Sequence, residues 1–319
     1  MATLNAHLQP EPAVLALHQR PLPEIALALL DNLMLDLKDG SLAEMFRDLG
    51  NYLAPQELAE IYQILAEATS DKGRQRIGAL APMWVQYLRG GASVYHREQL
   101  FDGAVLYRSA VAAALRPSMV CFTSNLAGMF MANCRFLDLM GKHAVDVVLL
   151  ATDDGAFGDW RLGGAAGFQP SLRALTAALA TRGIRPRLYV GASAGGAPSV
   201  FAAMMDGAAA ALMLGGRFYA PGRNIPLAAA GPAFEPLCDC WAGPVVPVYG
   251  IYGADMPTDV RNAAKLGALA PQARCYAIPK DNKHNPMAAL GARQHLRPVI
   301  EQIVALASGK PVNFEFVVA

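Results

Sequence analysis

The sequence predicts an α/β protein, with a mostly parallel sheet covered by helices on both faces and an all-helical region in front of it. Residues 20–91 carry apolar side chains at helical spacing with no strand pattern, whereas from about residue 100 short β-branched runs alternate with helical segments. Of the 319 residues, 54% are hydrophobic and only 17% are charged, which excludes a disordered chain and allows a large core. We therefore expect a helical region over 1–95 and an α/β domain over 96–319.

The first region contains four predicted helices. The first has an apolar stripe at helical spacing, with prolines before it and Gly40 after it. Ser41 and Glu44 have the spacing of a capping box at the start of the second helix. The third and fourth are amphipathic and end at a polar segment and at a double glycine. The four predicted helices cover 24–37, 41–49, 54–68 and 76–91.

In the second region, apolar β-branched runs bounded by glycine, proline or polar residues predict strands, and longer amphipathic segments between them predict helices. The predicted strands cover 104–109, 118–124, 144–152, 185–191, 210–216, 244–253 and 273–279. The predicted helices cover 171–183, 198–207, 258–269 and 286–308. Alternation of this length favours a parallel sheet, and ligands of such sheets bind at the carboxyl ends of the strands.

Charge and composition exclude several kinds of partner. The net charge is +1 and no Lys/Arg-rich run occurs, so we expect no nucleic-acid partner and no binding to an anionic membrane. The N-terminus does not read as a signal peptide, and no apolar run is long enough to span a bilayer. Five scattered cysteines fit a reducing cytoplasm, and the spacing of Cys238 and Cys240 does not match a metal site. We expect a cytoplasmic protein without a bound metal.

The segment LYVGASAGGAPSV, residues 188–200, places Ser193 between a predicted strand and a predicted helix. This is the context that a G-x-S-x-G nucleophile elbow requires, with Gly191 and Gly195 leaving room for close backbone approach. The N–H of Ala194 would then point to where an oxyanion forms. The alternative is a glycine-rich connection without chemistry, or a helix start that binds phosphate.

A serine nucleophile needs a base, and His284 is the best placed of the six histidines. It lies in the polar loop after the last predicted strand, on the side of the sheet where Ser193 is expected; the alternative is a solvated loop histidine. The base needs an orienting carboxylate, for which Asp255 and Asp259 follow the penultimate strand. We prefer Asp255, because Asp259 has an alternative role as a helix N-cap or first-turn acid.

The order Ser193, Asp255, His284 on successive late strands resembles that of the α/β-hydrolase superfamily. The resemblance covers about residues 100–308 and rests on GASAGG, the YGAD turn and the His284 loop; it does not cover the helical first 90 residues. A weaker likeness links the segment 149–164 and the Ser-Ala-Gly-Gly elbow to bacterial hydrolase-like proteins associated with surface glycan or glycoprotein export. In some of those the acid stands at the position of Asp259.

The resemblance implies a second oxyanion donor after an earlier strand, which here falls on main-chain N–H groups around Ser124 to Leu126, with help from the Asn125 amide. Asn125 is equally readable as a turn residue. The region 217–243 is expected to form a small lid or rim. The predicted substrate-pocket residues are Trp160, Phe218 and Tyr219. Phe218 and Tyr219 have an alternative role, in which they only pack the loop of 217–243 down. Arg217 and Arg223 are candidates to meet an anionic substrate group.

Together these features predict a serine hydrolase that cleaves an ester or thioester through an acyl-enzyme, without a metal or organic cofactor. Its substrate would be a small molecule or a carrier-bound acyl group. One alternative is an acyltransferase of the same fold with a carrier-bound acyl donor. Another is a non-catalytic assembly or binding protein, since a fold alone does not give activity. The N-terminal helices are candidates for contact with a second copy of the chain or with a carrier protein.

Overall fold

The protein is described here by a computed structural model that covers residues 20–34, 39–113, 116–124, 127–151, 161–162, 164–217 and 246–318. The chain divides into two compact units. The first comprises Met1–Tyr95 together with Ala132–Asp138, and the second comprises His96–Met131 and Leu139–Ala319. The sequence placed a boundary between residues 95 and 96, but nothing in its pattern indicated that a second segment belongs to the first unit.

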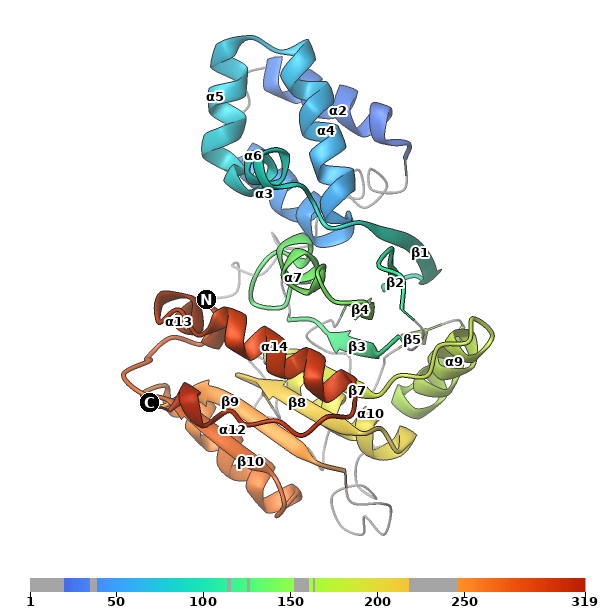
Figure 1. The fold of residues 1–319 in the computed structure, drawn as a ribbon, viewed down its shortest axis with the longest axis vertical. Helices are drawn as coiled ribbons and strands as arrows, with labels where there is room; N and C mark the ends of the chain where they lie inside the picture. Colours follow the sequence, from blue (N-terminus) through green and yellow to red (C-terminus); the bar gives the residue numbers. More distant parts are fainter. Residues whose placement is uncertain are drawn as a thin grey trace, which may run out of the picture. The chain divides into compact units, whose positions relative to one another are not determined.

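The first unit is helical, as predicted (Figure 1). Its helices are α2 (Leu22–Met34), α3 (Asp39–Tyr52), α4 (Pro55–Ala68), α5 (Asp71–Leu80) and α6 (Pro82–Gly90). Their apolar faces form one core, in which Phe46 meets the fully buried Trp84 edge to face with ring centroids 4.8 Å apart. Because α3 begins at Asp39, Ser41 lies inside the helix, and the capping box expected there is not formed.

Most of helix α7 (Asn133–Met140) belongs to the first unit. The main-chain and side-chain N–H groups of Asn133 donate to the side-chain and main-chain oxygens of Asn51 at 3.2 and 2.9 Å. The Tyr95 hydroxyl donates to the Leu137 carbonyl at 3.1 Å, and Cys134 Sγ lies 3.4 Å from Met83 Sδ. These buried contacts hold a segment from later in the sequence within the helical unit.

The second unit is built on an eight-stranded sheet of order β1-β2-β4-β3-β7-β8-β9-β10. Strand β2 pairs antiparallel with β4, and every pairing from β4 onward is parallel. This confirms the predicted mostly parallel sheet of an α/β protein. The strands are β1 (Tyr95–Phe101), β2 (Ala104–Ser109), β3 (Ser118–Phe122), β4 (Asp146–Leu150), β7 (Leu188–Ala192), β8 (Ala210–Leu214), β9 (Val248–Gly253) and β10 (Arg274–Ile278).

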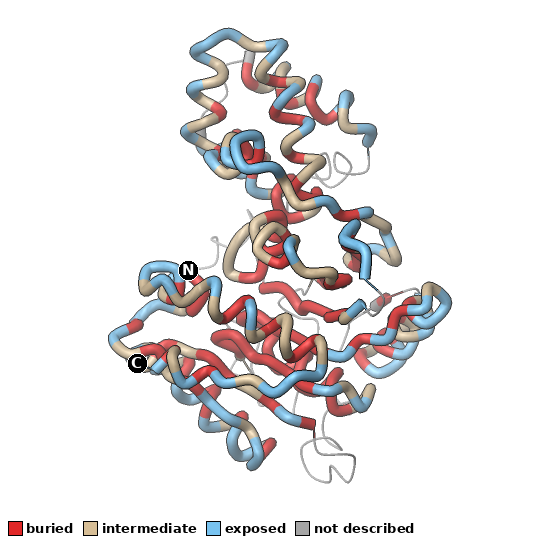
Figure 2. The backbone as a smooth tube through the Cα atoms, in the orientation of Figure 1, coloured by how far each residue is buried: buried red, intermediate tan, exposed pale blue. Residues whose placement is uncertain are grey.

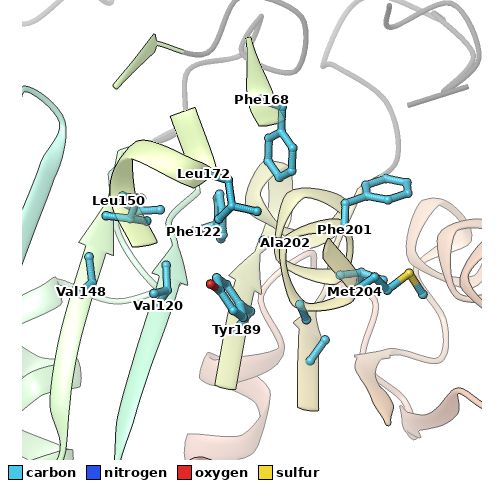
Figure 3. Packing of buried hydrophobic residues seen from close by; sticks show 14 of the residues in the cluster. Val120, Phe122, Val148, Leu150, Phe168, Leu172, Tyr189, Phe201, Ala202 and Met204 are labelled. Atoms are coloured by element: carbon cyan, nitrogen blue, oxygen red, sulfur yellow. The ribbon is translucent and has the colours of Figure 1, made fainter. Parts of the chain in front are cut away.

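Helices cover both faces of this sheet. On one face, α9 (Phe168–Ala180), α10 (Gly196–Asp206) and α12 (Pro257–Leu269) share a hydrophobic cluster with the strands (Figure 3). On the other face, α14 (Leu296–Ala307) runs across the strands in front of β7 and β8 (Figure 1). Strands β3, β4, β7 and β8 are buried along their whole length, which explains their near-continuous apolar sequences (Figure 2).

The predicted helix 286–308 is two helices, α13 (Pro286–Ala292) and α14. Pro298 explains the break, because its ring in a continuous helix would clash with the carbonyl of Gln294. Gln294 instead adopts a left-handed φ of 61° and turns the chain. The remaining short elements are β5 (Arg161–Leu162), β6 (Ala165–Ala166), η1 (Ser193–Gly195) and η3 (Glu315–Val317).

Candidate active site

A sharp turn places Ser193 at the carboxyl end of β7. The strand ends at Ala192, a single 3₁₀ turn covers Ser193–Gly195, and α10 starts at Gly196. Ser193 has φ of 52°, a left-handed conformation that is strained for a residue with a side chain. A Cβ on Gly191 would lie 2.0 Å from the Gly195 carbonyl oxygen, and one on Gly195 would lie 2.2 Å from that of Phe122. Glycine is therefore required at both positions.

His284 contacts the Ser193 hydroxyl. It lies in the loop between β10 and α13, and its Nε2 is 2.8 Å from Ser193 Oγ. The neighbouring Asn285 fixes this loop, because its side-chain oxygen accepts from Ala288 N at 2.9 Å and its Nδ2 donates to the Phe130 carbonyl at 3.3 Å. The parallel strands β7 and β10 end at the same edge of the sheet, which brings together residues 91 positions apart.

The carboxylate behind the histidine is that of Asp259, so the preference for Asp255 is corrected. Asp259 Oδ1 lies 2.6 Å from His284 Nδ1, and the Asp259 side chain is fully buried. Helix α12 is capped by Met256 without a side-chain bond, so Asp259 is a first-turn residue with its carboxylate free to reach the imidazole. Asp255 is exposed in the preceding turn, where its main-chain N–H donates to the Asp281 carbonyl at 3.0 Å.

Arg217 is the third side chain on the histidine, and its main-chain N–H also donates to the Ser193 carbonyl at 2.8 Å. Its Nε donates to His284 Nε2 at 3.0 Å. A guanidinium is always a donor, so Nε2 is an acceptor here. The neutral imidazole therefore carries its hydrogen on Nδ1, facing Asp259, which is the tautomer that a general base at Nε2 needs.

Phe130 forms a wall of the site that no pattern in the sequence indicated. Its ring meets that of His284 edge to face, with centroids 5.4 Å apart and an interplanar angle of 82°. A Cβ on Gly215 would lie 3.3 Å from the same ring. Phe130 has φ of 61°, and such a conformation in a bulky residue is a genuine outlier that its surroundings must enforce.

One of the predicted oxyanion donors is corrected. The main-chain N–H of Ser124 donates to the Gly128 carbonyl at 2.9 Å, so a tight turn uses this donor. The residue after the nucleophile, Ala194, is the second residue of the 3₁₀ turn, whose hydrogen bond runs from Gly196 N to Ser193 O. Early N–H groups of a helical turn have no partner within it. Asn125 and Leu126 lie outside the described residues.

Other predicted site residues also lie outside the described residues. They are the pocket residues Trp160, Phe218 and Tyr219, the arginine Arg223, and all of the predicted lid except Arg217. Within the described ranges, no group of three or more His, Cys, Asp or Glu side chains could hold a metal ion. No helix in the same ranges is long and apolar enough to cross a membrane.

The chain matches no protein-family model and no curated protein sequence. Its fold is similar to several solved structures. For 2,6-dihydroxy-pseudo-oxynicotine hydrolase the identity is 14%, the TM-score is 0.48 and 94% of each chain is covered. For S-formylglutathione hydrolase from Staphylococcus aureus the identity is 12% and the TM-score 0.43, with 67% of this chain and 98% of that one covered. For dienelactone hydrolase from Anabaena variabilis the identity is 14% and the TM-score is 0.42, with 64% of this chain and 96% of that one covered. The weaker likeness to proteins of glycan export stays a prediction.

Proposed function

We propose that this protein is a serine hydrolase that cleaves esters or thioesters through an acyl-enzyme. The proposal rests on one observation, the unbroken line of contacts from Ser193 Oγ to His284 Nε2 at 2.8 Å and from His284 Nδ1 to Asp259 Oδ1 at 2.6 Å. Nucleophile, base and orienting acid each lie within hydrogen-bonding distance of the next, as acyl transfer by this chemistry requires. We also retain the predicted cytoplasmic location and a small-molecule or carrier-bound acyl substrate.

In the first half of the reaction, Ser193 Oγ attacks the acyl carbonyl while His284 Nε2 accepts the hydroxyl proton. The buried Asp259 carboxylate stabilises the imidazolium that forms, and the Ala194 N–H stabilises the oxyanion of the tetrahedral intermediate. The intermediate collapses when the imidazolium gives its proton to the leaving alcohol or thiol. In the second half, His284 accepts a proton from water, which attacks the acyl carbon, and returns it to Ser193.

The strain at Ser193 has a place in this mechanism. With φ of 52°, the residue projects its hydroxyl from the turn instead of continuing the strand, at a local cost of about 1–3 kcal/mol. The close packing of Gly191 against Gly195, and of Gly195 against Phe122, holds the turn in that conformation. The nucleophile is thereby placed in advance, so the reaction does not have to order it.

A fluorophosphonate probe tests the proposal, because it forms a phosphonate ester with an activated serine and releases fluoride. We expect labelling of the native protein on the peptide that contains Ser193, and loss of labelling in Ser193→Ala and His284→Ala. Ser308→Ala removes a serine at the end of α14 and serves as the matched control, with labelling unchanged. A folded native protein that takes up no label would support the non-catalytic alternative instead.

A further inference from the structure

Arg217 is fastened beside the nucleophile by its main chain. It follows the Gly215-Gly216 pair at the end of β8, and Gly215 turns the chain with φ of 47°. A Cβ on Gly216 would lie 2.9 Å from Gly196 Cα, so this turn packs directly on the start of α10. Together with the hydrogen bond from Arg217 N to the Ser193 carbonyl, this packing fixes where the arginine leaves the backbone.

The side chain of Arg217 is a cation without an acidic partner among the described residues. Three other cations in the described part of the second unit do contact acidic side chains, Arg182 with Glu98, Arg116 with Asp146, and Lys142 with Glu301. Arg217 is instead half-buried, and its side-chain Nε contacts the imidazole of His284. Because partial burial makes an unpaired charge more costly than it is in water, this arrangement favours an anion as the partner of the Arg217 guanidinium.

The contact between Arg217 and His284 cannot survive the proposed reaction. Nε2 offers a single lone pair, toward which both the Ser193 hydroxyl at 2.8 Å and Arg217 Nε at 3.0 Å are directed. Once Nε2 takes the serine proton it becomes a donor, and two cations then face each other at hydrogen-bonding distance. The guanidinium must turn toward another acceptor, and a negatively charged one stabilises it most.

We infer that Arg217 binds a carboxylate of the substrate, so that the preferred substrates are esters or thioesters of short acyl chains that end in a carboxylate. The guanidinium presents a planar fork that matches a carboxylate with two parallel hydrogen bonds. Since Arg217 Nε and Ser193 Oγ both lie within 3.0 Å of the same nitrogen, the carboxylate must be close to the scissile carbonyl. This inference rests on the proposed function.

Binding of such a substrate also frees the base. A carboxylate that draws the guanidinium away from Nε2 leaves the lone pair to the serine hydroxyl alone, and it neutralises the cation before the imidazolium forms. A neutral acyl chain of the same shape does neither. Discrimination is therefore expected in the formation of the productive complex, before any bond is broken.

The test compares two esters of matched shape, monoethyl succinate and ethyl isocaproate, in which an isopropyl group replaces the carboxylate. Each is used to slow fluorophosphonate labelling of the native protein at constant ionic strength, and the concentration that halves the labelling rate is recorded. This readout works whether or not the ester is turned over. Arg217→Gln removes the charge, and Arg217→Lys keeps it without the planar fork.

We expect monoethyl succinate to protect the native protein at a concentration at least about tenfold lower than ethyl isocaproate, as a charge-assisted hydrogen bond predicts. Arg217→Gln should abolish this preference, and Arg217→Lys should retain part of it. Equal protection by the two esters in the native protein overturns the inference while labelling itself upholds the proposed function. Absence of labelling in the native protein overturns both. Should Arg217→Gln fail to fold, the comparison in the native protein and in Arg217→Lys still decides.

Discussion

Replacing Asp259 by Asn tests which carboxylate serves the histidine. The change keeps the volume of a fully buried side chain that lies 2.6 Å from His284 Nδ1, but it removes the negative charge. It also offers an amide N–H to Nδ1, which favours the tautomer with the hydrogen on Nε2. That tautomer cannot accept the serine proton.

The expected loss is large, because no solvent screens this contact. The equivalent change in serine proteases lowers kcat about ten-thousand-fold, which corresponds to about 5.4 kcal/mol of transition-state stabilisation. We expect a loss of this order for Asp259→Asn. Asp255→Asn is the matched control, since Asp255 is exposed and a surface change of this kind shifts free energies by no more than about 0.5 kcal/mol.

The assay is kcat/KM for the hydrolysis of a nitrophenyl ester, together with the rate of fluorophosphonate labelling. Thermal unfolding of each variant shows whether a loss of activity reflects a loss of folded protein. If Asp259→Asn keeps more than a tenth of the native kcat/KM, or if Asp255→Asn falls as far as Asp259→Asn, the assignment of Asp259 is refuted.

Two glycine substitutions should have opposite effects on stability, which urea unfolding measures. Gly195→Ala puts a Cβ 2.2 Å from the Phe122 carbonyl oxygen and should lower the free energy of unfolding by about 1–3 kcal/mol. Gly267→Ala should raise it by about 0.5–1 kcal/mol, because this position lies within α12 and has open space around it. Burial raises the pKa of the Cys134 thiol from 9.0 to about 12, so iodoacetamide at pH 8 should leave this residue unmodified in peptide mapping until the protein is denatured. Burial raises the pKa of Cys121 as well, and the folded state therefore holds protons that the unfolded state loses above about pH 9. The free energy of unfolding should therefore not depend on these two thiols below about pH 9, and it should fall as the pH rises toward 12. The decline should be shallower in Cys134→Ala, because that variant lacks one of the two thiols.

The sequence was sufficient to predict the elbow, because its requirements are local. A buried strand, a small-residue turn and a helix follow one another within residues 188–206, and the two glycines are dictated by the close approach of the backbone. The proximity of His284 to Ser193 is predictable as well, because parallel strands end at one edge of the sheet and both residues follow such strands. The all-helical first region likewise shows its periodicity within each segment.

The choice of acid failed for a physical reason. The sequence does not reveal whether α12 begins at Thr258 or at Pro257, nor whether a first-turn aspartate caps the helix or leaves it to reach another loop. The Asp259 side chain does not cap α12 and instead contacts His284 in another loop. The positions of Phe130 and Arg217 around His284 depend on how three loops converge, and no spacing within any one of them encodes that arrangement.

The helical unit includes the later segment Ala132–Asp138, and this limits where the protein can be cut into separate domains. A cut after Tyr95 would separate Leu42 and Trp84 from the later segment whose Cys134, Phe136 and Leu137 are themselves fully buried. The Asn51–Asn133 and Tyr95–Leu137 hydrogen bonds would be severed by the same cut. The N-terminal helices therefore do not form a unit by themselves. A transfer of this region to another protein must include both of its segments, the one up to Tyr95 and Ala132–Asp138.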